Sequence, residues 1–76
     1  MKALNEILNG RNRGLFRNTN GEYCRISKYY TGGNNENFEV IFAKGVFDIA
    51  TRPAINTTSE KKVLKLIKEE GFVLVS

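Results

Sequence analysis

The sequence predicts a small α+β domain: an antiparallel meander of four strands, formed by two hairpins, with an amphipathic C-terminal helix packed on one face. Two segments of alternating apolar and polar residues, interrupted by glycine-containing dipeptides at 20–21 and 44–45, predict the hairpins. Helical spacing of apolar residues after position 57 predicts the helix. With a short N-terminal helix and a short C-terminal strand, the predicted order is α-β-β-β-β-α-β in a single domain, residues 1–76.

The N-terminal helix and the first hairpin come first along the chain. Apolar residues at helical spacing over residues 2–9, followed by a glycine, predict a short amphipathic helix. Asn20 and Gly21 both tolerate positive φ and predict a two-residue loop, which pairs Leu15 with Ile26. The predicted core face of this hairpin consists of Leu15, Cys24 and Ile26, and the predicted outer face consists of Phe16, Asn18, Tyr23, Arg25, Ser27 and Tyr29.

The second hairpin follows a polar segment. Residues 31–37, TGGNNEN, have the composition of a turn and predict a loop. The next segment alternates on both sides of a turn at 44–45, and this register pairs Val40 with Ile49. One predicted face is apolar and consists of Phe38, Val40, Phe42, Phe47 and Ile49, while the other carries Glu39, Ile41 and Asp48.

The C-terminal segment predicts a capped helix and a short strand. Thr57 and Glu60 have the spacing of a capping box, and Gly71 suits the left-handed position that ends a helix. The apolar run 72–75 predicts the final strand. Packed on the meander, the helix is expected to complete a core of Leu15, Ile26, Val40, Phe42, Phe47, Ile49, Val63, Leu64 and Ile67.

The composition excludes several kinds of catalytic and metal site. The chain has 76 residues, with one Cys, no His and no Trp. Without His it has no Ser–His–Asp or Cys–His pair, and one Cys supplies neither a disulfide nor the roughly four ligands of a structural zinc site. Cys24 is expected in the core, and Glu39 and Asp48, the best carboxylate pair, are expected as solvated strand residues. We therefore expect no enzyme, no metal and no cofactor.

Nothing in the sequence predicts targeting to a membrane. The start, MKALNEILNG, lacks the apolar region and cleavage site of a signal peptide. No apolar run approaches the roughly 18–20 residues of a membrane span. The expected location is the cytoplasm, with no membrane partner.

The net charge of +4 is concentrated in the N-terminal third. Residues 1–28 contain six of the twelve Lys and Arg residues but only two of the eight acidic residues. This region includes the run GRNRGLFRN and the predicted aromatic outer face beside Arg25. Arginine forks suit phosphate, and exposed aromatic rings stack on bases. The final helix adds a basic stripe of lysines at helical spacing.

These observations predict a small, non-catalytic nucleic-acid-binding or regulatory module that uses the basic, aromatic first hairpin to contact DNA or RNA. The candidate binding residues are Arg11, Arg13, Phe16, Arg17, Tyr23, Arg25, Lys28, Tyr29, Lys61 and Lys65.

The same residues are also compatible with purely structural roles and with a protein partner. The N-terminal helix could cover Phe16, Tyr23 and Tyr29, and the lysines could form only the solvated face of an amphipathic helix. The alternative function is a compact protein-interaction module, such as a stand-alone inhibitor or adaptor of the kind that phages and mobile elements encode. The aromatic outer face and Ile41, which the predicted register exposes, favour this alternative.

Parts of the chain resemble two known families. Residues 65–76, KLIKEEGFVLVS, resemble the first helix and strand of HicA-type messenger-RNA interferases. Those proteins place a catalytic His after this strand, and because this sequence contains no His the resemblance implies no such activity here. The helix–strands–helix order also resembles double-stranded-RNA-binding domains, with Lys61-Lys62 at the start of the last helix. The loop motif of that family is not apparent, and the strand at 72–75 departs from its pattern.

Overall fold

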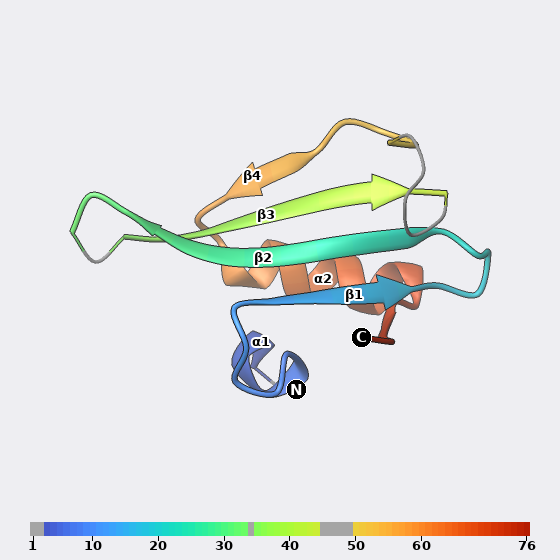
Figure 1. Ribbon diagram of the computed structural model, residues 1–76, viewed down its shortest axis with the longest axis horizontal. Coiled ribbons are helices and arrows are strands. Elements are labelled where there is room, and N and C mark those ends of the chain that lie inside the picture. Colours follow the sequence, from blue (N-terminus) through green and yellow to red (C-terminus); the bar gives the residue numbers. More distant parts are fainter. Residues whose placement is uncertain (1–2, 34, 45–49) are drawn as a thin grey trace.

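The computed structural model describes residues 3–33, 35–44 and 50–76, which form one sheet and two helices (Figure 1). The sheet has five antiparallel strands in the order β4-β3-β2-β1-β5. Along the chain the elements are α1 (Leu4–Ile7), β1 (Arg13–Arg17), β2 (Tyr23–Thr31), β3 (Asn35–Ala43), β4 (Ile55–Thr57), α2 (Glu60–Glu70) and β5 (Val73–Leu74). The predicted α+β class and the order α-β-β-β-β-α-β are confirmed, and the C-terminal strand lies beside β1.

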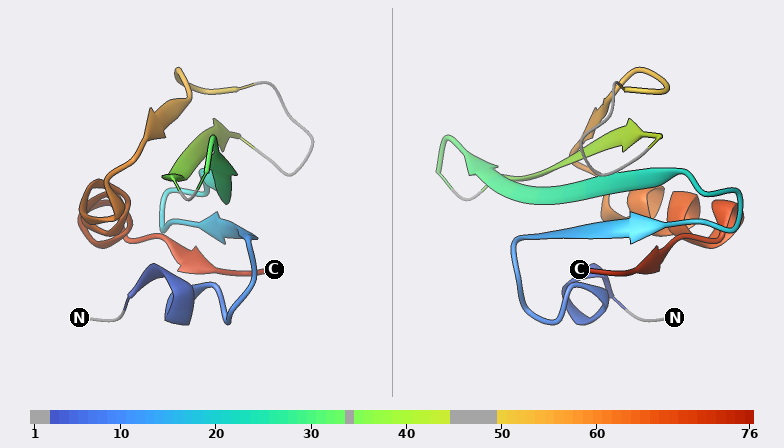
Figure 2. Two further views of the ribbon diagram at one scale, coloured as in Figure 1. Left: turned by 90° about the vertical axis from the view of Figure 1, so that its left-hand side faces the viewer. Right: turned by 45° about the vertical axis from the view of Figure 1, so that its right-hand side comes forward.

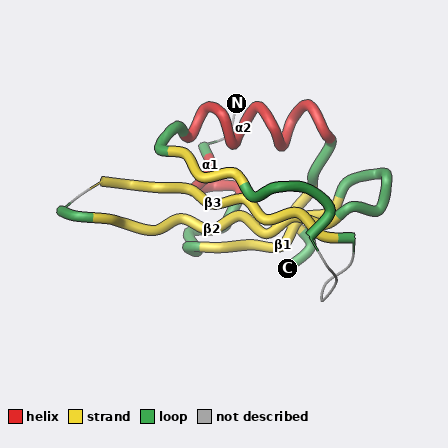
Figure 3. Tube along the Cα trace, turned by 90° about the horizontal axis from the view of Figure 1, so that it is seen from above, coloured by secondary structure: helices red, strands yellow, loops and turns green. Residues whose placement is uncertain are grey.

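The helices and the sheet form two layers. α2 runs along one face of the sheet (Figures 2 and 3), and residues of the α1 segment belong to the same core. That core consists of Leu4, Leu8, Phe16, Cys24, Ile26, Phe38, Val40, Phe42, Val63 and Phe72. A helix layer over the apolar face of a sheet is the expected way to bury that face. The opposite face of the sheet is covered by neither of the described helices.

The first hairpin has a register one residue away from the predicted one. Leu15 pairs with Arg25 and Phe16 with Cys24, whereas the predicted two-residue loop paired Leu15 with Ile26. Because side chains alternate between the two faces, this shift moves every side chain of β1 to the other face. Phe16 is fully buried, at 0% exposure, and Leu15 is half-buried on the opposite face. The predicted core position of Leu15 and the predicted outer position of Phe16 are both wrong.

The length of the loop explains the shift. The loop contains residues 19–21, because Asn18 still pairs with Glu22: the Asn18 N–H donates to the Glu22 carbonyl at 3.0 Å. The Asn18 side-chain oxygen also accepts hydrogen bonds from the N–H groups of Asn20 at 3.1 Å and Glu22 at 2.9 Å. Gly21 is the last loop residue and has a φ of 82°, the left-handed conformation that closes a three-residue hairpin loop. Asn18 is therefore buried and not on the outer face as predicted.

β2 and β3 extend beyond the other strands as a two-stranded ribbon (Figure 1). Their pairing continues as far as Thr31, so the loop predicted over residues 31–37 is largely strand. Polar side chains bridge the ribbon: the Tyr30 hydroxyl donates to Glu36 at 3.2 Å, and the Asn37 amide donates to the Thr31 hydroxyl at 2.6 Å. Such polar cross-strand pairs stabilise strands without an apolar face, which is why the composition did not reveal them.

The strand paired with the outer edge of β3 is not the predicted one. Val40 pairs with Ile55 of β4, so the predicted pairing of Val40 with Ile49 is wrong. The predicted core residues Phe47 and Ile49 lie within residues 45–49, outside the described residues. β4 has only three residues, which are too few to show alternation in a sequence.

The two ends of α2 differ in how well they were predicted. Ser59, not Thr57, is the N-cap, and its hydroxyl accepts a hydrogen bond from an N–H of the first turn at 3.4 Å. Gly71 ends the helix in the left-handed conformation, as predicted, with a φ of 67°. The N–H of the following residue, Phe72, donates to the Ile67 carbonyl at 3.0 Å, which completes the C-terminal cap.

The α1 segment packs closely against β1. α1 spans Leu4–Ile7 and is shorter than the predicted helix over 2–9, whose first residue is not described. Gly14 permits the close packing: a Cβ atom there would lie 2.7 Å from a methyl group of Leu74 and 2.8 Å from a methyl group of Leu8. The absence of a side chain at this position therefore lets α1 and β5 both approach β1.

Candidate nucleic-acid interface

The sheet face turned away from the helices, called the open face below, carries five of the ten predicted binding residues. Its positions alternate along each strand with the buried core residues. The open face comprises Arg13, Leu15 and Arg17 of β1, Tyr23, Arg25, Ser27 and Tyr29 of β2, and Asn37, Glu39 and Ile41 of β3. Strand alternation and register therefore bring side chains from three strands to one surface.

The corrected register moves two arginines onto this face. Strand alternation in the predicted register implies that Arg13 and Arg17 share the side of Leu15, although both are among the predicted binding residues. In the structure Arg17 pairs with Tyr23, and Arg13 pairs with Ser27, so both project to the same side as Arg25. All three arginines are exposed. The open face is thus more basic than the sequence predicted.

Among the residues that the structure describes, most carboxylates near β1, β2 and β3 lie on the helix side of the sheet and not on the open face. Glu39 is the one described acidic residue of β1, β2 or β3 on the open face, and it is half-buried. Glu36 projects to the helix side, where it accepts a hydrogen bond from Tyr30. Glu22 is bonded to Arg52 at 3.0 Å. Three arginines and one described carboxylate make the local field of the open face positive.

The two tyrosines of the open face are held by polar neighbours. The guanidinium carbon of Arg17 lies 5.7 Å from the centroid of the Tyr23 ring, a cation–π distance. The Tyr29 hydroxyl donates to the Asn56 side-chain oxygen at 3.5 Å, and this residue is 39% exposed. The expectation that the N-terminal helix covers these rings is wrong, because the α1 segment packs into the core on the opposite side.

A basic hollow of about 370 Å³ lies at the N-terminal end of β1. Arg11, Arg13 and Arg25 line it, together with Gly14, Leu15 and Ser76. Arg11 precedes the strand and is anchored there, since its Nε–H donates to the Leu8 carbonyl at 3.3 Å. The three arginines come from two strands and a loop, and guanidinium groups are donors suited to phosphate or carboxylate groups.

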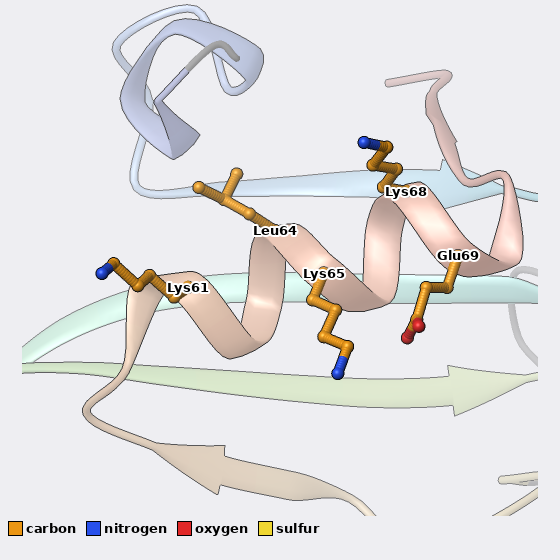
Figure 4. A pocket seen from close by; sticks show the side chains of 5 residues that line it. All are labelled: Lys61, Leu64, Lys65, Lys68 and Glu69. Carbon is orange, nitrogen blue, oxygen red and sulfur yellow. The ribbon is translucent and has the colours of Figure 1, made fainter.

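The remaining predicted residues lie elsewhere. Phe16 belongs to the core, so its ring is not available to a partner. Lys28 projects to the helix side, and its ammonium lies 4.0 Å from a Glu36 oxygen. Lys61 and Lys65 lie on α2, across the sheet from the open face (Figure 4). The structure therefore separates the predicted site into a basic, aromatic sheet face and a basic helix surface.

The helix surface carries less net charge than its lysines suggest. Lys61, Lys65 and Lys68 line a shallow hollow with Leu64 and Glu69. Figure 4 shows that Lys65 and Glu69, one helical turn apart, extend from the same side of the helix. The carboxylate partly offsets the neighbouring ammonium group, as Glu39 does for the arginines of the open face. What distinguishes the open face is therefore its two tyrosines and the arginine-lined hollow, and not a larger net charge.

The predictions about other reactive groups have different outcomes. Cys24 is a core residue, as predicted, and burial is the main reason that its pKa is raised from 9.0 to about 12, with a smaller contribution from the charge of Glu22. Its thiol is therefore protonated and inaccessible. Of the predicted carboxylate pair, Glu39 is on the open face and Asp48 lies outside the described residues.

Two apolar residues of the open face are relevant to a partner. Ile41 is 37% exposed, as predicted, and Leu15 lies beside Arg25 instead of in the core. The prediction did not place Leu15 on the open face because the register of the first hairpin, which was predicted wrongly, decides on which face this side chain lies. At the edge of the sheet, Val73 pairs with Arg17 and is 62% exposed.

Comparison with known proteins adds no family: no family model, curated protein or solved structure matches the chain. Within the described ranges, no group of three or more Cys, Asp or Glu side chains is placed to hold a metal ion. Neither helix in the described part of the chain is long and apolar enough to span a bilayer.

Proposed function

We propose that the protein is a small, non-catalytic nucleic-acid-binding module whose binding surface is the open face. One observation carries this proposal: Arg13, Arg17 and Arg25 lie beside Tyr23 and Tyr29 on a sheet face that no described helix covers. Arginine forks neutralise phosphates, and exposed aromatic rings accept stacked bases. This combination of groups is typical of surfaces that bind nucleic acid.

A salt-dependent titration tests the proposal. Fluorescence anisotropy of a labelled oligonucleotide is measured against the protein at several salt concentrations, with DNA and RNA probes. Binding that weakens as salt rises is expected, because each neutralised phosphate releases a counterion. Arg25→Gln and Arg13→Gln are each expected to weaken binding and to lower the slope of log affinity against log salt by about 1.

The matched control is a pair of charge changes on the other side of the sheet. Lys61→Gln and Lys65→Gln remove the same charge from α2 and are expected to change affinity by less than about twofold at moderate salt, where exposed charges farther apart than a Debye length are screened. No binding at low salt, or binding without a salt slope, would show that the proposed function is wrong.

A protein-interaction module is the second candidate, and the apolar residues of the open face favour it. Ile41 and Val73 are large apolar residues that remain exposed, at 37% and 62%. A protein partner would bury them, whereas phosphate contacts would not. Affinity capture after nuclease treatment separates the candidates: a partner that is retained by the wild type and lost from Ile41→Lys would favour this second function.

A further inference from the structure

We infer that the open face binds single-stranded nucleic acid, with unstacked bases placed on Tyr23 and Tyr29 and the intervening phosphates on Arg25 and Arg13. This inference rests on the proposed function and specifies its ligand. It assigns different tasks to the aromatic and the basic residues, which can be tested separately.

The spacing of the side chains along β2 suits a single-stranded nucleic acid. Tyr23 and Tyr29 lie on the same face of β2, six residues apart, which corresponds to about 20 Å at roughly 3.3 Å per residue. Arg25 and Ser27 lie between them on that face. A single-stranded nucleic acid that runs along β2 therefore passes an aromatic ring, a cation, a hydroxyl and a second ring in that order. Extended single strands are bound by such alternation of rings and charges.

A duplex cannot use both kinds of residue. In double-stranded nucleic acid the faces of the bases are stacked on one another, so tyrosine rings on a sheet have no base face to contact. Only the arginines would then bind, and the tyrosines would be without effect. The presence of two rings on the surface, at 39% exposure for Tyr29 and with Tyr23 half-buried, distinguishes this face from a purely basic one.

Each of the two rings has one polar neighbour that favours a particular ring orientation. Arg17 lies 5.7 Å from the centroid of the Tyr23 ring, and Tyr29 is tied through its hydroxyl to Asn56. Rings with restricted orientation lose less conformational entropy when a base stacks on them. The Asn56 contact is at the edge of the Tyr29 ring, whereas Arg17 lies over one face of the Tyr23 ring, so a base stacks on the opposite face of Tyr23 or displaces Arg17.

The basic hollow supplies the phosphate contact between the two rings. Arg11, Arg13 and Arg25 line a space of about 370 Å³ that lies against β1, next to the path along β2. Guanidinium forks donate paired hydrogen bonds to phosphate oxygens, which fixes the position of the backbone. The hollow therefore fixes the position of the nucleic-acid backbone, and the tyrosines stack on the bases to either side of it.

Tyrosine fluorescence provides a direct test, because the chain contains three Tyr and no Trp. The protein is titrated with oligodeoxythymidylate and oligouridylate of about twelve nucleotides, within the usual site size of a single-strand-binding domain, and with a duplex of the same length. We expect the single strands to bind at least about tenfold more tightly than the duplex and to quench the tyrosine emission.

Three variants assign the quenching to the open face. Tyr30 lies on the helix side of the ribbon, so Tyr30→Phe is the matched control and is expected to retain both the quenching and the affinity. The double variant Tyr23→Phe/Tyr29→Phe keeps two rings that can stack, so it should bind within about twofold of the wild type but lose the quenching. Tyr23→Leu/Tyr29→Leu removes the rings and should weaken binding by tenfold or more.

The outcomes separate this inference from the proposed function. If the duplex binds as tightly as the single strands and the leucine variant binds normally, while Arg25→Gln weakens both, the inference is wrong and the proposed function stands. If no probe binds at low salt, the proposed function itself is wrong. Thermal unfolding of each variant by circular dichroism confirms that a loss of binding is not a loss of folding.

Discussion

Arg52 lies over the ring of Phe42, with its guanidinium carbon 3.7 Å from the ring centroid. The same guanidinium donates to Glu22 at 3.0 Å and to Glu70, and the hydrogen bond with Glu70 is the main reason that the pKa of Arg52 is raised above its ordinary value. Glu22 precedes β2 and Glu70 ends α2. Arg52 therefore ties the first hairpin and the helix to one aromatic residue of the core.

Replacing Arg52 by methionine is expected to destabilise the protein. Arg52→Met keeps much of the volume over Phe42 but removes the cation, so Glu22 and Glu70 lose their ion pair with Arg52, although Glu22 keeps the hydrogen bond from the Thr51 hydroxyl. The Arg52 side chain is 37% exposed, so solvent screens part of the ion pairing, and we expect the free energy of unfolding to fall by about 1–2 kcal/mol. Urea unfolding followed by circular dichroism measures this change. Arg25→Met, on the open face, is the control, and equal midpoints for both variants would contradict the assignment.

Truncation of neighbouring residues in β1 tests the hairpin register. Phe16→Ala opens a cavity in the core and is expected to lower the free energy of unfolding by about 3–5 kcal/mol. Leu15→Ala removes a half-buried side chain from the open face and is expected to cost about 1 kcal/mol. The midpoints of urea unfolding of the two variants show which substitution destabilises the protein more. A larger loss for Leu15→Ala would indicate a two-residue loop instead of the observed one.

The close packing at Gly14 predicts a coupling between two residues. A Cβ at position 14 would meet Leu74 and Leu8, so Gly14→Ala is expected to destabilise the protein by about 1–3 kcal/mol. In a Leu8→Ala background the clash with Leu8 is removed, so the loss of unfolding free energy caused by Gly14→Ala should be smaller than in the wild type. A double-mutant cycle measures this difference. An equal loss in both backgrounds would show that Leu8 does not limit the approach.

The buried thiol predicts a loss of stability at high pH. The pKa of Cys24 is raised from 9.0 to about 12 in the folded protein, chiefly by burial. Between these values the unfolded chain loses the proton while the folded chain retains it, so stability is complete below pH 9 and decreases as the pH rises. Cys24→Ala lacks this group and does not lose this contribution. As the pH is raised from 8 to 10.5, the unfolding free energy of the wild type should therefore fall toward, or below, that of Cys24→Ala. A constant difference between the two proteins would contradict the prediction.

The sequence predicted those parts of the fold that depend on local signals. Gly71 ends α2 as expected because only a left-handed residue completes that cap. The face shared by Tyr23, Arg25 and Tyr29 was also predicted correctly, since alternation within one strand does not depend on the register with its neighbour. The order of elements is the predicted one, although its fourth strand is Ile55–Thr57 and not the second half of the predicted second hairpin.

The errors arose where the sequence pattern is compatible with more than one arrangement. Asn20-Gly21 is compatible with loops of two or three residues, and the hydrogen bonds of the Asn18 side chain select the longer loop. That choice set the face of Arg13, Phe16 and Arg17, the three candidate residues that lie on β1. β4 was missed because Ile55 pairs with Val40 within a strand too short to show a period.

The position of β5 has a consequence for how the chain folds. β5 follows every other strand in the sequence yet pairs with β1, at Phe16–Leu74 and Arg17–Val73, so β1 is bonded on both sides only after β5 has been synthesised. Contacts between such distant residues raise the entropic cost of the folding transition state and slow folding. Until β5 docks, β1 presents an exposed strand edge, the kind of edge that promotes association between partly folded chains. The late synthesis of this two-residue strand therefore lengthens the period in which the nascent chain exposes an unpaired edge of β1.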